Sequence, residues 1–206
     1  ARLIDLLRGG TNHLATGLMG GTFDPIHIAH LIIAEEALDL LGLSRVIFVP
    51  SARPPHKSGD DITSVEHRLE MVRLAIDGNP RLALSDLEVR RTEPSYTVET
   101  VRQFRRELGE HEKLYFIMGA DSLAQFFTWK DPLELIGSCE FAVAPRPGMG
   151  PGEGDPRIRE KAHMLDTPLI GVSSSDIRER VRTGRSISYL VPSAVSAYIR
   201  EKNLYS

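Results

Sequence analysis

Two histidines three residues apart, His27 and His30, follow a glycine pair in the segment GGTFDPIHIAH, residues 20–30. Gly20 and Gly21 let the backbone turn tightly and approach a ligand closely. The apolar spacing that follows predicts a helix, whose first turn offers unpaired N–H groups and a partial positive charge to an anion. Residues three apart share one face of a helix. The segment therefore predicts a phosphate site with both imidazoles turned toward the same anion, rather than one core and one surface histidine.

A second segment suited to phosphate is GVSSSDIRER, residues 171–180. Its serines, Ser173 to Ser175, offer hydroxyl and N–H groups at the start of a predicted helix. Arg178 lies on the first turn of that helix and can reach the same anion. Alone, the pattern is also typical of an ordinary serine-capped helix with a solvated arginine. Beside the histidine segment, it favours a second wall of one phosphate site.

The chain as a whole alternates apolar, β-rich runs with helical patterns. Strands are predicted at residues 14–21, 45–50, 81–86, 113–119, 140–145 and 168–172. Helices are predicted at residues 28–42, 63–77, 97–109, 131–137 and 173–184, with a last one from about Ser193. The alternation predicts an α/β fold, a Rossmann-like parallel sheet with helices on both faces and a C-terminal helical element.

The predicted strands place the chemistry. Ligands bind beyond the carboxyl ends of the strands in such sheets, and both phosphate-type segments follow a predicted strand. The pattern TSVE at residues 63–66 predicts a capping box where the second helix opens.

The length of 206 residues fits a single domain, with residues 1–13 interpreted as a short extension rather than a signal peptide. A formal net charge of −3 gives no support for binding of nucleic acid or a membrane surface. No apolar run is long enough to span a bilayer. The one cysteine, Cys139, is interpreted as buried filler, and a chain without an intrachain disulfide is typical of the reducing cytoplasm.

Several other functions lack their sequence signals. Neither the G-x-G-x-x-G of dehydrogenases nor a G-x-x-x-x-G-K-[ST] loop occurs in the chain. Cysteine and histidine have no zinc-site spacing, and there is no G-x-S-x-G elbow. The sequence therefore disfavours dehydrogenases, P-loop enzymes, zinc proteins and serine hydrolases.

The histidine segment resembles the signature of the nucleotidyltransferase superfamily, histidine, any residue, glycine and histidine, with Ala29 in place of the glycine. Further stretches are similar to the bacterial nicotinate-nucleotide adenylyltransferase family. They are PSARPPHK at 50–57, EPSYTVETV at 93–101, FIMGADSLAQFFTWKD at 116–131 and SISYLVPSAVSAYIRE at 186–201. Four matching stretches in the right order are more specific than any one of them. The resemblance begins near Gly17 and leaves the first dozen residues uncovered.

This resemblance implies adenylyl transfer from ATP to nicotinate mononucleotide, which gives nicotinate adenine dinucleotide and pyrophosphate, a step of NAD biosynthesis. It implies that the charge of the leaving pyrophosphate is stabilised by His27, His30, Lys57 and Arg178. Mg²⁺ is the implied cofactor. The sequence shows few acidic ligands, so the nucleotide is expected to hold the metal.

The resemblance also assigns the binding residues. Those implied to contact ATP are Gly20, Gly21, Thr22, Phe23, Gly119, Asp121, Ser174, Ser175 and Ile177. Those implied to contact nicotinate mononucleotide are Ser95, Tyr96, Thr97, Trp129 and Arg146. Asp121 is expected to accept a hydrogen bond from a ribose hydroxyl, and Trp129 to stack on the pyridine ring. Without the resemblance, Trp129 would be interpreted as a packing residue.

Two other functions stay open at this stage. Another transferase of the superfamily, acting on phosphopantetheine or making a CDP-alcohol, would share the histidine segment but not the PSYT and FFTWKD stretches. A nucleotide-binding regulator would keep the fold and lose catalysis, with Ala29 as the sign of that loss. The sequence also leaves open a homo-oligomer, the preference for the acid over the amide, and closure of residues 147–156 over the ligand.

Overall fold

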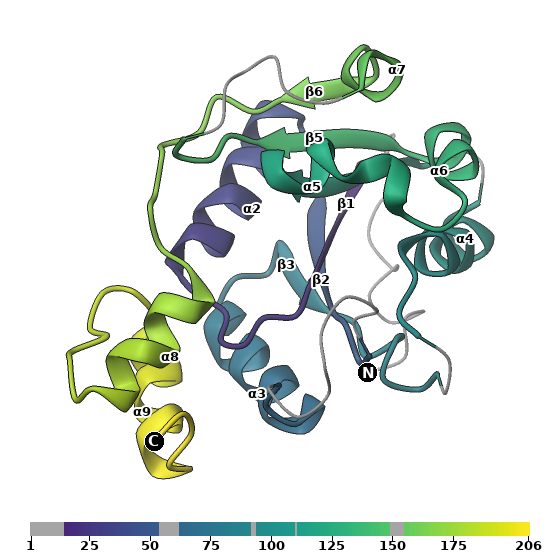
Figure 1. Ribbon diagram of the computed structural model, residues 1–206. Helices are drawn as coiled ribbons and strands as arrows, with labels where there is room; N and C mark the ends of the chain where they lie inside the picture. The colour runs from purple at the N-terminus through teal and green to yellow at the C-terminus, as the bar shows by residue number, and fades with distance from the viewer. Residues whose placement is uncertain (1–14, 54–61, 92–93, 110, 149–154) are drawn as a thin grey trace.

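The computed structural model describes residues 15–53, 62–91, 94–109, 111–148 and 155–206. Within them, one sheet is formed by β1 (Ala15–Gly21), β2 (Arg45–Pro50), β3 (Leu82–Leu84), β4 (Lys113–Gly119), β5 (Glu140–Ala144) and β6 (Ala162–Met164). The order along the sheet is β3-β2-β1-β4-β5-β6, and all neighbours are parallel (Figure 1). This confirms the predicted Rossmann-like α/β fold. The winding reverses between β1 and β4, and ligands bind beyond the carboxyl ends of strands at such a point.

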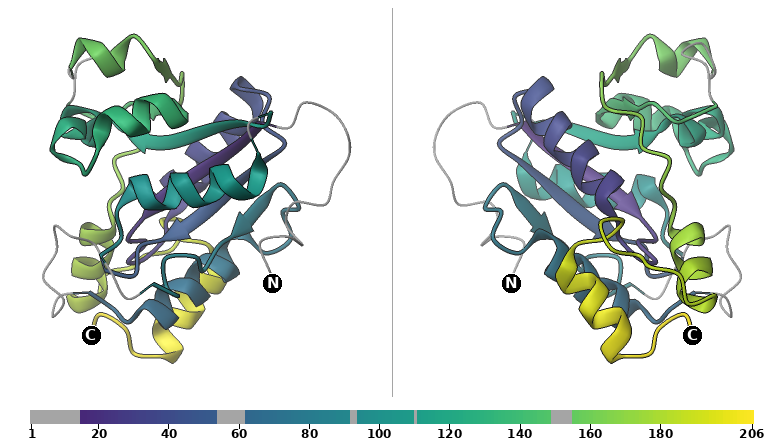
Figure 2. Two further views of the ribbon diagram at one scale, coloured as in Figure 1. Left: turned by 90° about the vertical axis from the view of Figure 1, so that its right-hand side faces the viewer. Right: turned by 90° about the vertical axis from the view of Figure 1, so that its left-hand side faces the viewer.

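Helices cover both faces of the sheet, as predicted. They are α2 (Ile28–Leu40), α3 (Val65–Ile76), α4 (Thr97–Leu108), α5 (Ala120–Ala124), the 3₁₀ turn η2 (Phe126–Thr128), α6 (Pro132–Ser138), α7 (Pro156–Arg159), α8 (Ser174–Arg182) and α9 (Ser193–Glu201). The two opposite views of Figure 2 place α4 in front of the sheet in one and α2 in front in the other. The first two helices and the C-terminal pair share one core, and α4 to α7 share the other.

Strand side chains alternate between these two cores. In β2, Val46 and Phe48 join the core under α2 and α3, whereas Ile47 and Val49 join the core under α4. All four side chains are at most 1% exposed. A parallel sheet covered on both faces is buried throughout, which is why its strands are uninterrupted apolar runs in the sequence.

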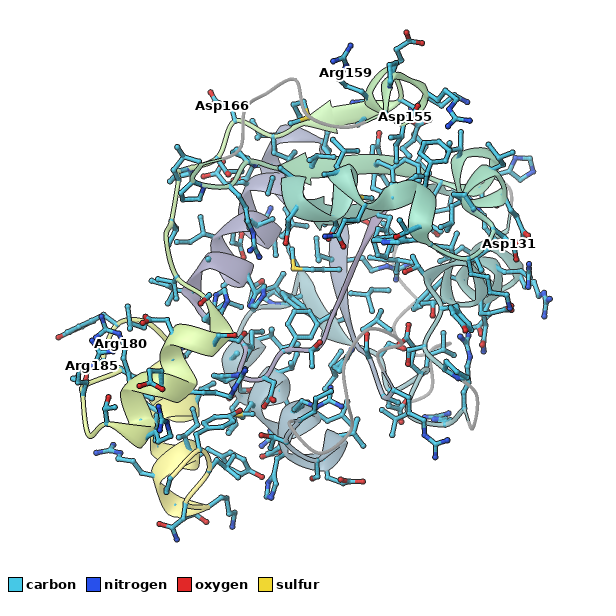
Figure 3. The ribbon with its side chains drawn as sticks, viewed as in Figure 1. Asp131, Asp155, Arg159, Asp166, Arg180 and Arg185 are labelled. Atoms are coloured by element: carbon cyan, nitrogen blue, oxygen red, sulfur yellow. The ribbon has the colours of Figure 1, made fainter. Side chains whose placement is uncertain are left out.

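The C-terminal helical element is also confirmed. Helix α9 packs against α3, with Val195 and Ile199 in the shared core. Residues 165–173 run as a connecting segment from the β6 edge to α8 (Figure 1). Arg180 and Arg185 lie on the side of the C-terminal helical element that is away from the sheet (Figure 3). Among the helices that the structure describes, none combines the length and hydrophobicity needed to cross a membrane.

The predicted strand at 168–172 is wrong. Within the described residues, the sixth strand is β6, which pairs with β5, and 168–172 belongs to no strand. Pro168, Ile170 and Val172 instead line a pocket beside the turn between β1 and α2. Their alternation reflects contact with this pocket rather than pairing in the sheet.

The predicted capping box at 63–66 is not formed at Thr63. Helix α3 begins at Val65, with Ser64 as its N-cap. The N–H of Thr63 donates to Oδ2 of Asp24 at 3.2 Å, and its carbonyl accepts from Nε of Arg68 at 2.9 Å. Because Asp24 takes the N–H of Thr63 and the Arg68 side chain takes its carbonyl, the helix begins beyond it.

One predicted strand is shorter than expected, and three short elements are not predicted at all. β3 spans three residues of the predicted 81–86. Helices α5 and α7 and the turn η2 are not predicted, because elements of five residues or fewer carry little periodicity. The N-terminal extension, and residues 149–154 of the segment 147–156, lie outside the described residues.

Candidate active site

The turn after β1 is closely packed at its two glycines, where a side chain would require a neighbouring ring to shift. A Cβ on Gly20 would lie 3.2 Å from Cζ of Phe116, and one on Gly21 would lie 3.0 Å from Cζ of Phe23. Phe23 is 3% exposed and has a φ of 50°, in the left-handed region. A contact between Phe23 and ATP is therefore limited to its backbone. The carbonyl of Thr22 faces inward and accepts from Nη1 of Arg68 at 2.8 Å.

The structure brings the two histidines of this turn together. His27 is the N-cap of α2, with extended φ and ψ of −142° and 172°, and His30 is the third helical residue. The backbone N–H of His27 donates to Nδ1 of His30 at 3.2 Å, and the rings stack with centroids 3.7 Å apart. The pair therefore meets through the cap of the helix rather than as two residues of its first turn. Because Nδ1 of His30 is an acceptor here, the ring hydrogen sits on Nε2, where it can be donated to a ligand.

Both imidazoles are held neutral near pH 7. Burial, aided by the positive charge of Arg146, lowers the pKa of His27 from 6.5 to about 4. Burial first, then His27 and Arg146, keep the pKa of His30 well below its usual range. Nδ1 of His27 is buried and has no hydrogen-bond partner among the described residues. The site thus offers neutral imidazoles, and a bound triphosphate would raise the pKa of each.

A small pocket opens beside the two rings. It is lined by His27, Ala29, His30, Ile33, Pro145, Arg146, Pro168, Ile170 and Val172. These residues come from the N-cap and first two turns of α2, from the two positions after β5 and from the connecting segment that leads to α8. Ala29 is among the lining residues, at the position where the superfamily signature has a glycine.

The predicted ribose ligand Asp121 is paired with the predicted substrate residue Arg146. Their Oδ1 and Nε atoms lie 3.4 Å apart, and both side chains are about half exposed. A Cβ on Gly119 would come within 2.5 Å of the same Oδ1 atom. Gly119 therefore makes room for the ion pair at the carboxyl end of β4, next to the histidines whose pKa values Arg146 lowers.

The first turn of α8 docks on the histidine turn. Ser173 caps the helix by accepting from the N–H of Asp176 at 3.1 Å, as the sequence predicts. The hydroxyl of Ser174 donates to the carbonyl of Pro25 at 2.9 Å. Nη1 of Arg178 donates to the carbonyl of Asp24 at 2.7 Å, so the guanidinium reaches the turn that it was expected to face.

Two residues of α8 that were predicted to bind ATP differ in which of their groups a nucleotide could contact. Nη2 of Arg178 donates a hydrogen bond to the Ser175 hydroxyl oxygen at 3.4 Å. Ile177 is fully buried in the core, so that only its backbone could contact a nucleotide. Lys57, the fourth predicted catalytic residue, lies outside the described residues.

Three of the predicted nicotinate residues, Ser95, Tyr96 and Thr97, lie at the start of α4, whereas Arg146 pairs with Asp121 beside the histidines. Tyr96 is the N-cap and Thr97 the first helical residue, as predicted. Nζ of Lys130 lies 4.8 Å above the Tyr96 ring, which brings the neighbouring Trp129 to this helix end. The first N–H groups of a helix have no partner within it and suit a carboxylate.

Two of the predicted nicotinate residues have structural contacts of their own: Trp129 packs against aromatic rings, and Ser95 makes hydrogen bonds to the loop after β2. The Trp129 indole contacts the rings of Phe116 and Phe126, with centroids 5.9 Å and 5.5 Å away, and stays partly exposed. Ser95 is 9% exposed, and its hydroxyl accepts from the N–H groups of Ala52 and Arg53. It therefore ties the loop after β2 to the start of α4.

Sequence reasoning missed three polar residues beneath the site, Asp24, Arg68 and Tyr205. Oδ1 of Asp24, which is 2% exposed, accepts from the Tyr205 hydroxyl at 2.6 Å. Burial, with the charge of Asp24, raises the pKa of Tyr205. Arg68 is 1% exposed. A signal for it existed, because Arg68 falls on the apolar stripe of its helix, three and four residues before Met71 and Val72.

The described residues hold no group of three or more histidine, cysteine, aspartate or glutamate side chains that could bind a metal. Near the histidine pair, the carboxylate of Asp24 is engaged with Thr63 and Tyr205, and that of Asp121 with Arg146. This part of the chain therefore offers no metal centre built from protein ligands alone.

Comparison with known proteins places the chain in a family. Residues 18–180 match the cytidylyltransferase-like family. A probable nicotinate-nucleotide adenylyltransferase from Moorella thermoacetica is 46% identical over 92% of this chain and 90% of its own length. The chain belongs to the nicotinate-nucleotide adenylyltransferase family. Another member, from Dehalococcoides mccartyi, is 41% identical over 93% of this chain and 97% of its own.

A solved structure shares the fold of this family member. Plasmodium falciparum nicotinic acid mononucleotide adenylyltransferase, complexed with NaAD, gives a TM-score of 0.79 at 24% identity. The match covers 94% of this chain and 98% of that one. At this identity the likeness shows the fold, and the roles of individual residues in the adenylyltransferase rest on the geometry above.

Proposed function

We propose that the chain transfers the adenylyl group of ATP to nicotinate mononucleotide, giving nicotinate adenine dinucleotide and pyrophosphate. The observation that carries this proposal is the stacked pair of His27 and His30 at the carboxyl end of β1, with Arg146 and Arg178 beside it. The relatives at 46% and 41% identity bear the name of this activity.

The reaction needs positioning and charge stabilisation rather than a covalent intermediate. A phosphate oxygen of the mononucleotide forms a bond to the α-phosphorus of ATP, and the bond from that phosphorus to the oxygen bridging to the β-phosphate breaks. The attacking phosphate is already ionised, so no general base has to remove a proton. Nε2–H of His30 donates to the phosphate oxygens on which charge develops. Arg178 and Lys57 supply positive charge for the leaving pyrophosphate.

We further propose that Mg²⁺ enters with ATP as part of the substrate. Magnesium is commonly held by substrate phosphates with few protein ligands, which fits a site without a carboxylate cluster in its described part. When bound with ATP, the ion would offset the negative charge of the phosphate oxygens.

The two ends of the proposed substrate have separate anchors. The mononucleotide carboxylate is placed at the first N–H groups of α4, by Tyr96 and Thr97, with Trp129 against the pyridine ring. ATP is placed between the histidine turn and α8. We also propose small-molecule substrates as the partners in this reaction and a cytoplasmic location, which the single Cys139 favours. A homo-oligomer stays a prediction.

A coupled assay of pyrophosphate release tests the function. The chain is incubated with ATP, Mg²⁺ and one acceptor: nicotinate mononucleotide, its amide form or phosphopantetheine. Turnover with the nicotinate compound above the other two is expected. Faster turnover with phosphopantetheine would replace the proposal by the related transferase, and binding of ATP without release of pyrophosphate would favour the regulator.

A further inference from the structure

Arg68 donates hydrogen bonds to backbone carbonyls in two turns of the site. Its side chain makes four hydrogen bonds within the described residues, all to backbone carbonyls. The acceptors are Thr22 at 2.8 Å, Ser51 at 2.7 Å, Thr63 at 2.9 Å and Ala52 at 3.5 Å. Thr22 belongs to the histidine turn after β1, whereas Ser51 and Ala52 follow β2. One buried guanidinium therefore fixes the distance between these two turns.

A second buried charge, Glu88, lies on the other side of the same loop. It is 5% exposed, and its Oε1 accepts from the hydroxyl of Thr100 in α4 at 2.5 Å. Burial raises the pKa of Glu88, and the hydroxyls of Thr100, Ser95 and Ser51 oppose that rise by stabilising the carboxylate. Its Oε2 is buried without a hydrogen-bond partner among the described residues.

Arg68 contacts the peptide groups of residues 51–53 directly, and Glu88 acts on them through the Ser95 hydroxyl. The carbonyls of Ser51 and Ala52 point to Arg68, and the N–H groups of Ala52 and Arg53 point to the Ser95 hydroxyl. Arg68 comes from α3 on one face of the sheet, and Glu88 contacts α4 on the other. The loop is thus held from both faces, between the histidine turn and the start of α4.

We infer that Arg68 and Glu88 are positioning residues for adenylyl transfer. They touch no substrate, since both are buried. By holding residues 51–53 they set the spacing between the groups that hold ATP and those that hold the mononucleotide, and they fix the point from which the chain leads to Lys57. This inference rests on the proposed function.

The fork of the guanidinium is what this role requires. Arginine has five N–H donors in one plane and can bridge carbonyls of separate segments, whereas a lysine ammonium is a single point charge. Arg68→Lys therefore keeps the charge and loses the bridge. Glu88→Gln keeps the shape and one acceptor oxygen, but it removes the negative charge and replaces the other oxygen by an NH₂ donor.

The amino-terminal end of the sheet supplies matched controls. Arg45 and Glu112 form an ion pair there at 3.1 Å, with side chains 12% and 13% exposed. Nε of Arg45 also donates to Thr16 at 2.9 Å. Arg45→Lys and Glu112→Gln therefore disturb largely buried charges by the same substitutions, on β2 and just before β4, at the far end from the site.

The experiment compares kcat and KM for both substrates among the four variants, at the same folded fraction by circular dichroism. Displacing reacting groups by about 1 Å costs on the order of 10²-fold, so Arg68→Lys should lower kcat/KM by about that factor. Glu88→Gln should raise KM for the mononucleotide about tenfold, the scale of replacing a hydrogen bond to a charged acceptor by one to a neutral acceptor, and leave KM for ATP near the wild-type value. The two control variants should keep both constants within about twofold of the wild type.

Equal losses in the site variants and their controls would overturn the inference, because a general loss of stability would then explain them. If Arg68→Lys does not fold, the same split of KM values in Glu88→Gln decides the matter, and an unchanged Glu88→Gln overturns it. Failure of the proposed function would appear differently, as a wild-type chain without turnover. Calorimetric binding of a non-hydrolysable ATP analogue to Arg68→Lys and Arg45→Lys would then test the positioning by Arg68.

Discussion

The histidine pair predicts a loss of stability in mild acid that begins well above the carboxylate range. Burial lowers the pKa of His27 from 6.5 to about 4. The unfolded chain, with the ordinary pKa, takes up its proton first as the pH falls. Stability is therefore complete above pH 6.5, declines between pH 6.5 and about 4, and has lost this contribution below that range.

The magnitude follows from the size of the pKa change. Lowering a pKa from 6.5 to about 4 corresponds to about 3 kcal/mol, which is a large part of the stability of an ordinary domain. His30 adds to the same trend, because its pKa is also well below the usual range. Replacing His27 by asparagine removes the titrating group and should flatten the decline by up to that amount.

The assay is urea unfolding followed by circular dichroism at steps from pH 7.5 to 4.5, for the wild type and His27→Asn. Carboxylates far from the site contribute equally to both proteins, so the difference between the two curves reports the histidine pair: the loss of His27 and the change it causes in His30. The free energy of unfolding of the wild type should fall more steeply with pH. Parallel curves would refute the account, since they would mean that His27 is not buried as a neutral ring.

Three further outcomes concern turnover and binding. His30→Ala should lower kcat by roughly two to three orders of magnitude with the fold intact, the scale for one charge-stabilising donor, and wild-type kcat would contradict its role. Gly119→Ala should push aside the Asp121 carboxylate and raise KM for ATP, while stability changes by about 1 kcal/mol or less, as for an exposed ion pair. Trp129→Ala should raise KM for the mononucleotide about tenfold. Phe127→Ala is the control and should leave this KM unchanged, because the Phe127 ring lies two positions away and packs against the Arg157 guanidinium.

The local pattern of apolar and polar residues was sufficient to predict most of the strands and helices. The buried runs of β1, β2, β4 and β5, and the helical spacing of α2, α4 and α9, lie where the sequence predicts them. Gly42 and Gly109 follow the ends of their helices with φ of 60° and 79°, as helix-ending glycines do. These features depend on residues close together in the chain, so a single sequence reports them.

The histidine site was also predictable in part, because GGTFDPIHIAH is one continuous segment. The sequence could not state that Arg146 lies beside His27, or that Nδ1 of His30 would be bound by its neighbour's N–H. Burial first, and then Arg146, decide that the rings are neutral. Both depend on how β5 and the cap of α2 are placed by the sheet.

Tertiary structure alone decided where polar groups found their partners. Thr63 lost its expected cap because Asp24, 39 positions earlier, takes its N–H. Residues 168–172 line a pocket instead of joining the sheet, and Arg68 uses an apolar stripe to reach carbonyls of two turns. Periodicity in a sequence encodes which side chains are buried. It does not encode which distant group each buried donor or acceptor meets, because that depends on the order of the strands and the packing of the helices.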